Sequence, residues 1–294
     1  MDSIGLSTGT LWRLGERTLG FPRPLGVGIV NVTDDSFWEG ARSKTAHQAI
    51  VDGLRMTRAG FDLLDVGAVA ARSGPPVPPD EEAGRLVPAI EGLARERRVP
   101  ITADTFSPQV ARRALAAGAD AINDISGAGD PAMLELVAES GCGLVITHIE
   151  GPPRTEREPP SYDDPVEHMK RWFAERIEAA GGRGVAEDQI AIDPGFDFDL
   201  SVDDDLEILR RLGELKVLGR PLFVSLSRKD FLGAVLAGSW EERLPPSDRE
   251  WATAAAVALA VTAGADVLRL HDASALQAMQ IAAAIDAPRG VEVG

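Results

Sequence analysis

Five side chains that can hydrogen bond or ionise lie at or just beyond the ends of short apolar segments. They are Asn31, Asp104, Asn123, Asp193 and Lys229. Two carboxylates, two amides and one ammonium suit hydrolysis poorly, but they can clamp a flat heterocycle with many donors and acceptors. A carboxylate such as Asp193 can accept two parallel hydrogen bonds from a guanidine-like edge, and Lys229 can donate to a ring carbonyl and nitrogen. The alternative for each residue is that it simply caps a strand or a helix.

A second group of side chains suggests an anion site. Arg72 follows an apolar segment, and Arg269 and His271 lie two residues apart, so that they share one face if their segment is a strand. Buried cations are costly without a partner, and a diphosphate opposite Asn31 would satisfy them. For His271 alone, a core histidine paired with the backbone is an equal alternative.

Eight apolar segments must position these side chains. They span residues 25–31, 61–67, 101–105, 120–126, 143–148, 190–195, 221–227 and 266–271. Between them lie stretches with apolar residues at helical spacing, each ending at a glycine suited to a helix C-cap. These include residues 46–60, 107–118, 131–141 and 251–264. The alternation predicts an α/β protein, a (β/α)8 TIM barrel with its site at the C-terminal ends of the strands.

The chain is expected to form a single domain, because 294 residues suit one barrel. Residues 1–24 predict an N-terminal hairpin extension, with Gly15 at its turn, that closes the bottom of the barrel. Residues 25–288 would form the barrel itself. The run SVDDDLEILRRL predicts a helix with acids in its first turn, and the Pro-rich residues 150–165 predict a mobile or lid-like loop.

The composition of the chain limits which partners and which cell compartment we expect. The formal net charge of −16 argues against nucleic acid. The single cysteine, Cys142, suits a reducing compartment, and neither a membrane span nor a leader segment is recognisable, so we expect a cytoplasmic protein. The sequence has no Walker loop, no His/Cys metal cluster and no Gly-x-Ser-x-Gly elbow. No role is predicted for His47 and His168, which fall on polar helix faces.

Six motifs follow one another along residues 10–285 in a characteristic order. They are GIVNVTDDSFWEG (28–40), FDLLDVGAVAARSG (61–74), DTFSPQVARRALAAGADAINDISG (104–127), IDPGFDF (192–198), SLSRKDFLG (225–233) and GADVLRLHD (264–272). In this order they resemble the dihydropteroate synthase family and, more broadly, the pterin-binding barrels. The resemblance implies that 6-hydroxymethyl-7,8-dihydropterin diphosphate loses diphosphate while 4-aminobenzoate, or a related amine, captures the pterin methylene group, in folate biosynthesis.

The resemblance also implies roles for single residues. The pterin would be held by Asp104, Asn123, Asp193 and Lys229. The leaving diphosphate would meet Asn31, Arg72, Arg269 and His271, and a magnesium ion would bridge it to Asn31. Phe37 and Phe198 would flank the aminobenzoate, with Ser227 near its carboxylate. We assign catalytic roles to Lys229, Arg269 and His271. Family members are usually homodimers through helices near the C-terminus, here the alanine-rich residues 252–263.

The departures from the family pattern concentrate around the second substrate. Ala71 and Ser73 replace the usual Thr and Pro beside the arginine, Ala68-Val69-Ala70 replaces Gly-Glu-Ser, and Asp34 stands where Pro is usual. Asp197 and Asp199 replace glycines and would repel a benzoate carboxylate. This predicts weak use of 4-aminobenzoate and a preference for an uncharged or cationic amine.

Two alternatives to a synthase remain open. A pterin-dependent methyltransferase that passes a methyl group to a corrinoid protein needs no diphosphate site, so Arg72, Arg269 and His271 argue against it. A non-catalytic pterin-binding paralogue or regulatory partner is compatible with the altered loops.

Overall fold

The computed structural model describes residues 10–32, 45–70, 74–96, 98–155 and 157–287. The predictions for Phe37, Arg72 and the substitutions at positions 34, 71 and 73 therefore lie outside the described residues.

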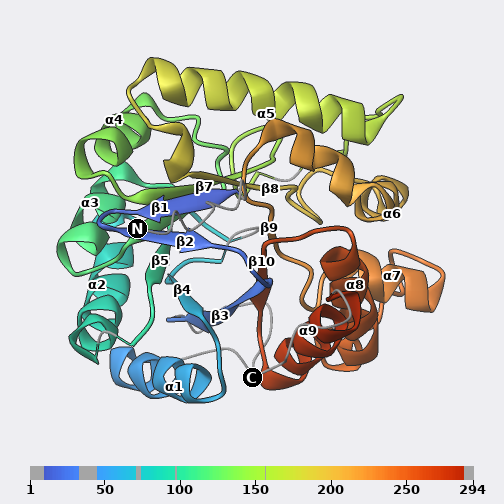
Figure 1. Cartoon of the computed structure of the whole chain (residues 1–294), viewed down its shortest axis with the longest axis horizontal. Coiled ribbons are helices and arrows are strands. Elements are labelled where there is room, and N and C mark those ends of the chain that lie inside the picture. Colours follow the sequence, from blue (N-terminus) through green and yellow to red (C-terminus); the bar gives the residue numbers. More distant parts are fainter. Residues whose placement is uncertain (1–9, 33–44, 71–73, 97, 156, 288–294) are drawn as a thin grey trace, which may run out of the picture.

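Eight parallel strands form the centre of the molecule (Figure 1). They are β3 (Leu25–Asn31), β4 (Leu63–Gly67), β5 (Ile101–Asp104), β6 (Ala121–Asp124), β7 (Gly143–Thr147), β8 (Ile190–Asp193), β9 (Phe223–Val224) and β10 (Val267–Leu270). Their order is β8-β7-β6-β5-β4-β3-β10-β9, and a parallel bridge between Ile192 and Leu222 joins the two outer strands. Every residue of β4, β6, β7 and β8 is buried, as expected for strands covered on both faces. The predicted barrel is confirmed.

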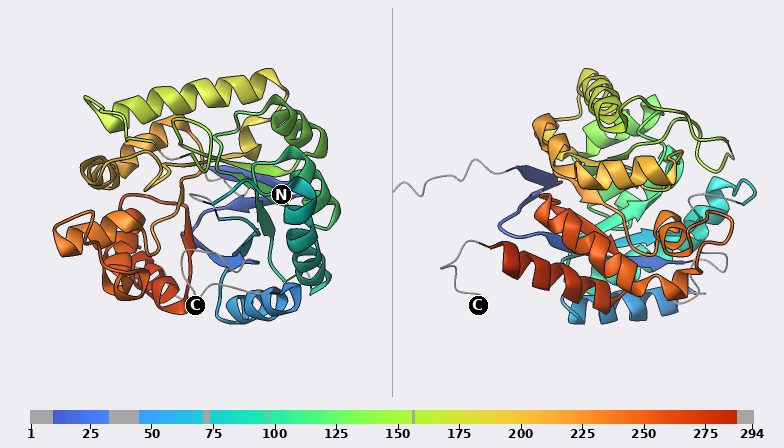
Figure 2. Two further views of the ribbon diagram at one scale, coloured as in Figure 1. Left: turned by 180° about the vertical axis from the view of Figure 1, so that it is seen from behind. Right: turned by 90° about the vertical axis from the view of Figure 1, so that its right-hand side faces the viewer.

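Helices surround the strands on the outside (Figure 2). They are α1 (Ala46–Arg58), α2 (Pro79–Glu96), α3 (Pro108–Ala116), α4 (Pro131–Ser140), α5 (Pro165–Gly182), α6 (Val202–Arg210), α7 (Asp230–Ala237), α8 (Glu250–Thr262) and α9 (Ala273–Asp286), with short 3-10 turns η2 (Glu187–Gln189), η3 (Leu212–Leu218) and η4 (Pro246–Asp248). Local sequence sets their ends. Ser201 and Asp204 form a capping box at the start of α6, and Gly141 ends α4 with a left-handed φ of 70°.

An N-terminal hairpin covers one end of the barrel, as predicted. Its strands are β1 (Leu11–Leu14) and β2 (Arg17–Gly20), and Gly15 lies in the turn with φ 63°. Trp12 and Leu14 are buried against residues from the N-terminal parts of the barrel strands: Val27, Leu63, Ala121, Val145, Ala191, Phe223 and Val267. The Trp12 indole N–H donates to the carbonyl of Gln189 at 2.9 Å. This end of the barrel is therefore an apolar core with its one indole donor satisfied.

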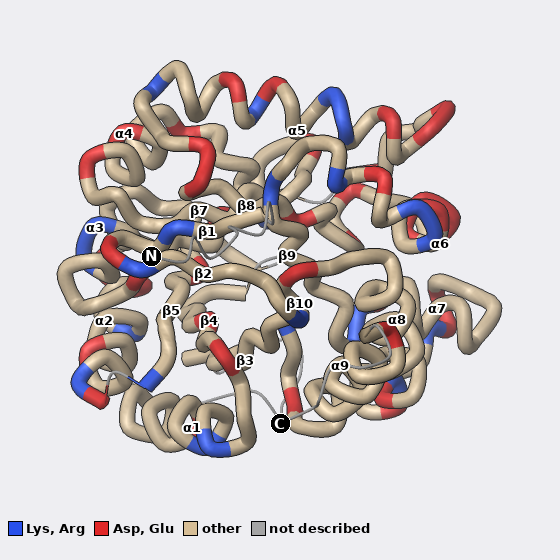
Figure 3. The backbone as a smooth tube through the Cα atoms, viewed as in Figure 1, with Lys and Arg blue, Asp and Glu red and all other residues tan. Residues whose placement is uncertain are grey.

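Charged residues of both signs are spread over the outer helices (Figure 3). Helices α7, α8 and α9 differ, because each has a single acidic residue and no basic one. Among the described residues, no helix combines the length and apolar character needed to cross a membrane.

Candidate active site

The inward faces of the strands become polar toward their C-terminal ends. Side chains two residues apart on a strand share a face. On seven strands, one residue packs against the hairpin, and the residue two positions later faces inward as well. These later residues are Ile29, Asp65, Asn123, Thr147, Asp193, Ser225 and Arg269. The same strands that pack the hairpin at one end therefore bring polar and charged groups together at the other.

Asp65 on β4 is the centre of a buried hydrogen-bond network. Its carboxylate is fully buried and accepts from Arg269 Nε at 2.5 Å, from Asn123 Nδ2 at 3.2 Å and from the Thr102 hydroxyl. Arg269 Nη2 donates to Asp104 Oδ2 at 2.8 Å. The network thus joins strands β4, β5, β6 and β10. No role was predicted for Asp65 from the sequence.

This network contains more acceptors than donors. Burial, and next the neighbouring Asp65 carboxylate, raise the pKa of Asp104 to about 7, although Arg269 opposes the shift. Asn123 Oδ1 is buried and has no hydrogen-bond partner within the described part of the chain. A ligand that presents several N–H donors would satisfy both groups.

Asp193 on β8 lies in a second acceptor position. It is buried, and it accepts from the Gly195 backbone N–H at 2.9 Å and from the Ser225 hydroxyl at 2.8 Å. Burial raises its pKa, while the nearby Lys229 ammonium counteracts part of that shift. Lys229 Nζ donates to the Phe196 carbonyl at 2.6 Å and lies 4.7 Å from the centroid of the Phe198 ring. Asp193, Lys229 and Phe198 are thus neighbours, as their predicted roles require.

His271, just beyond β10, is a neutral imidazole in this structure. Burial, followed by repulsion from Arg269, lowers its pKa to about 3. Its Nδ1 lies 2.9 Å from the Ser227 hydroxyl oxygen, which also accepts from the His271 backbone N–H at 3.3 Å. Two predicted site residues, Ser227 and His271, are therefore in contact. Among the described residues of the predicted anion site, the positive charge therefore comes from Arg269 and not from this histidine.

The structure shows hydrogen-bond partners for the two aspartates on which the expected weak use of 4-aminobenzoate rests. The Asp197 carboxylate accepts from the backbone N–H groups of Asp230 (2.5 Å) and Phe231 (2.9 Å), so it caps α7. Asp199 pairs with Arg157 at 2.7 Å and accepts from the Glu150 backbone N–H at 3.1 Å. Both carboxylates are engaged by donors of the protein. The repulsion expected of a benzoate carboxylate is therefore reduced, and weak use of 4-aminobenzoate stays a prediction.

Residues 150–165 were predicted to form a mobile or lid-like loop. In its described part, Arg154 donates to the Ala70 carbonyl (2.9 Å) and to the Pro75 carbonyl (2.7 Å), and the mobility of the loop stays a prediction. His168 was given no role, yet its Nε2 lies 2.6 Å from Glu150 Oε1. Its helix begins after the long loop, and the sequence alone does not indicate which residues of that loop it faces.

Known proteins similar to this chain have names that point to one family. Residues 27–271 match the model of a family described as pterin binding enzyme. The chain is 37% identical over 269 residues to a dihydropteroate synthase from Synechocystis, covering 91% of this chain and 89% of the relative. It is 38% identical over 280 residues to a protein of Mycobacterium leprae named inactive dihydropteroate synthase 2, covering 93% and 94%. A structure of Xanthomonas albilineans dihydropteroate synthase with 4-aminobenzoic acid superposes with a TM-score of 0.85, at 38% identity, covering 96% of this chain and all of the other.

Proposed function

Because this chain belongs to the pterin-binding enzymes and, within them, to the dihydropteroate synthase family, we propose that it condenses 6-hydroxymethyl-7,8-dihydropterin diphosphate with 4-aminobenzoate. In this reaction the bond between the hydroxymethyl carbon and the diphosphate oxygen breaks. A bond from that carbon to the amine nitrogen forms, and the amine gives up one proton. The relative from Xanthomonas albilineans was solved with 4-aminobenzoic acid, which supports this choice of amine.

One observation supports pterin recognition more than any other: the excess of buried acceptors at the barrel mouth. The Asn123 carbonyl oxygen lacks a partner among the described residues, and the pKa of Asp104 is raised to about 7. The amino-pyrimidinone edge of a pterin presents N–H groups to such acceptors. Asp193 would accept from that edge, and Lys229 would donate to the ring carbonyl and nitrogen.

Departure of the diphosphate requires positive charge close to the oxygen that gains electrons. Arg269 supplies it in our proposal, because its guanidinium has five N–H donors and its bonds to Asp65 and Asp104 engage two of them. These carboxylates also fix the orientation of the guanidinium. Neutral His271 would act as a hydrogen-bond donor to the anion, not as a second cation. Phe198, against Lys229, would form one wall of the amine site.

A magnesium ion fits the chemistry of this mouth, and we propose Asn31 as its protein ligand. Asn31 ends β3 and pairs in register with Gly67, two residues beyond Asp65 on β4. Its amide oxygen is a hard donor, and Mg²⁺ commonly takes one or two protein oxygens while substrate phosphates supply others. When bound, the ion would neutralise charge on the leaving diphosphate. Asn31→Ala should remove the dependence of diphosphate binding on magnesium, as measured by calorimetry with and without the ion.

A second candidate function is binding of a pterin diphosphate without turnover. The observation that favours it is the similarity to the Mycobacterium leprae relative named inactive, which is 38% identical to this chain, as close as the relatives named synthases. The replacement of Gly-Glu-Ser by Ala68-Val69-Ala70 is compatible with such a role.

The deciding experiment measures diphosphate release from the pterin diphosphate with and without 4-aminobenzoate. A synthase releases diphosphate and forms dihydropteroate only when both substrates are present. Tight binding of the pterin diphosphate without release in either condition would identify the non-catalytic candidate. Absence of binding would refute both.

We also propose a homodimer through α8 and α9 and a cytoplasmic location. Several large apolar side chains of these helices are exposed, among them Trp251 (83%), Leu259 (58%), Ile281 (63%) and Ile285 (78%). A second copy would cover them. Sedimentation of Trp251→Glu should give a monomer if this face forms the dimer. The buried thiol of Cys142 supports a reducing compartment.

A further inference from the structure

Three potential metal ligands meet where the loop after β7 faces α5. His148 directly follows β7, Glu150 lies two residues further on, and His168 lies in the first turns of α5. The ligand atoms of the three side chains all lie within 4.8 Å of one another. His148 Nε2 lies 3.3 Å from Glu150 Oε1, and His168 Nε2 lies 2.6 Å from the same oxygen.

The His148 ring is the unusual member of this cluster. Its side chain is fully buried, and neither ring nitrogen makes a hydrogen bond of acceptable geometry in the described part of the chain. Buried imidazole nitrogens without such bonds are costly. The ring cannot easily turn away, because it packs edge-on against Trp172 at 4.9 Å and against His168 at 5.6 Å between ring centroids.

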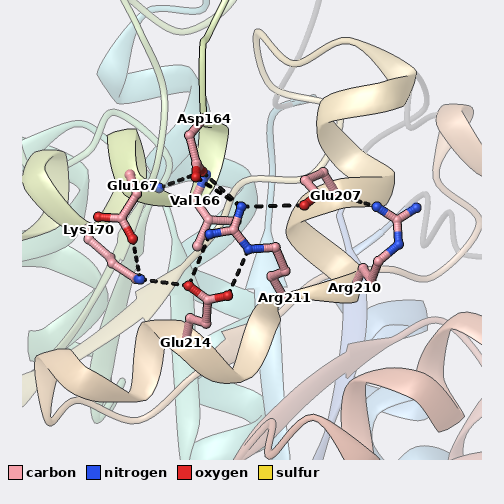
Figure 4. A network of polar contacts seen from close by, with 8 residues as sticks. All are labelled: Asp164, Val166, Glu167, Lys170, Glu207, Arg210, Arg211 and Glu214. Carbon is pink, nitrogen blue, oxygen red and sulfur yellow. Dashed lines mark hydrogen bonds and ion pairs between the residues drawn. The ribbon is translucent and has the colours of Figure 1, made fainter.

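The other two ligands are held in place by their neighbours. The Tyr162 hydroxyl donates to Glu150 Oε1 at 2.7 Å, which is the kind of outer hydrogen bond that orients a ligating carboxylate. Asp164 caps the first turn of α5 and bonds Arg211 at 3.0 Å, and Lys170 bridges Glu167 and Glu214 (Figure 4). The polar network in that figure fixes the turn from which His168 projects.

We propose that His148, Glu150 and His168 form a binding site for one divalent transition-metal ion of the zinc class. Two imidazoles and one carboxylate are ligands that zinc takes readily. In a tetrahedral site with bonds of about 2.0–2.1 Å, neighbouring ligand atoms lie roughly 3.3 Å apart, which matches the spacing between His148 and Glu150. The shorter contact to His168 must widen, and a glutamate side chain has the freedom to do so.

One member of the cluster reaches the surface. The side chain of His168 is 27% exposed, which gives an ion a path from solvent.

Metal binding would have a structural consequence. The ion would join the segment from His148 to Glu150 to α5, and the Glu150 backbone N–H already bonds Asp199 in the loop after β8. Arg157, which also bonds Asp199, lies within the bridged segment. The site contains none of the residues assigned to pterin or diphosphate, so its test is independent of the proposed reaction.

The experiment titrates the metal-free, full-length protein with Zn²⁺ against a chromophoric chelator, and with Co²⁺ while recording visible absorption. We expect one Zn²⁺ per chain, and a cobalt spectrum typical of four- or five-coordinate ions. His168→Ala and Glu150→Gln should each weaken zinc binding at least about tenfold, the scale on which even outer-shell partners act. His47→Ala, on α1, is the matched control and should bind as wild type. Zinc should also slow tryptic cleavage after Arg154 and Arg157 in the wild type but not in His168→Ala.

Three results would overturn the proposal. They are the absence of stoichiometric zinc in the wild type, equal affinity in wild type and His168→Ala, or loss of affinity in His47→Ala as large as that in the site variants. Circular dichroism of each variant establishes that it is folded, and His168→Ala is the safest change because its side chain is partly exposed. If His168→Ala lowers the melting temperature but zinc shifts neither protein, the cluster is only a hydrogen-bonding group and the metal site is refuted.

Discussion

The two ends of the barrel are built on the same strands and differ in what those strands bury. At the hairpin end, Trp12 and Leu14 pack on apolar side chains such as Val27 and Leu63. Two residues further along the same faces, the interior holds charges such as Asp65 and Arg269. A step of two residues therefore separates an apolar core from an ionic network.

The difference indicates where stability and function reside. A buried tryptophan removes on the order of 150–250 Å² from water, and apolar burial stabilises by about 25 cal/mol per Å². Buried ion pairs contribute little net stability, because desolvation offsets their attraction. The hairpin end is thus the source of stability, and the mouth is the place where the fold accepts a cost in exchange for recognition.

The largest effect expected from this contrast is at Trp12. Trp12→Ala should destabilise the protein by about 4 kcal/mol, since it removes a large buried side chain and leaves a cavity. Leu11→Ala on the same hairpin, where the side chain is 52% exposed, should change stability by only about 0.5 kcal/mol or less. Urea unfolding measures both. At temperatures where Trp12→Ala is folded, its pterin affinity should equal that of the wild type, and a lost affinity would show that the two ends are not independent.

A slightly smaller loss of stability is expected at the opposite end of the barrel, where the ionic network lies. Asp65→Ala should cost about 3 kcal/mol, because it leaves the partly buried Arg269 guanidinium with fewer partners. The control is Arg23→Ala, which removes an ion pair with Asp62 at the hairpin end where the arginine is 55% exposed, and it should cost about 1 kcal/mol or less. A loss at Asp65 no larger than that at Arg23 would contradict the view that the network depends on mutual neutralisation.

Pterin binding should be sensitive to substitution of Asp193. Asp193→Asn should weaken pterin binding by about 1.5–3 kcal/mol, the range for hydrogen bonds to charged groups. Calorimetric titration tests this, with Asp188→Asn as the control, since Asp188 pairs with Arg13 of the hairpin. Unchanged affinity in Asp193→Asn would remove this residue from the site.

The elements could be predicted from the sequence because the signal for each is local. Each barrel strand is a mostly buried run of four to seven residues, except β9, which has two. The turn residue Gly15 and the acidic residues in the first turn of α6 act on their immediate neighbours. The eight predicted segments therefore agree with the observed strands to within a few residues at their ends.

The pairing of site residues could not be predicted, because it depends on contacts between distant strands. Asp65 and Arg269 are 204 positions apart and meet because β3 alone separates β4 from β10. A usable signal existed: in a barrel, an inward acid and an inward arginine at the same level attract each other. The partners of Asp197 and Asp199, which are the start of α7 and Arg157, could not be foreseen for the same reason.

The smallest expected effect concerns pH and Asp104. Its pKa is raised from the ordinary 3.8 to about 7, so the folded protein holds this proton more tightly than the unfolded chain. The stabilisation linked to this proton is fully present below about pH 4 and is lost as the pH rises through 7. Other groups titrate in the same interval, among them Asp124, whose pKa burial raises to about 6. The comparison with a variant isolates Asp104, since the remaining groups are common to both proteins.

Asp104→Asn cannot titrate, so its unfolding free energy should fall less than that of the wild type between pH 5 and pH 8. The decreases in unfolding free energy of the two proteins should differ by at least about 1 kcal/mol over this interval, because one pKa unit corresponds to about 1.4 kcal/mol. Urea unfolding at both pH values measures the difference, and Asp80→Asn is the control, since Asp80 forms an exposed pair with Arg113. Parallel curves for wild type and Asp104→Asn would mean that Arg269 keeps Asp104 ionised throughout. The mouth would then be a balanced ionic network that already resembles the hairpin end in having its polar groups satisfied.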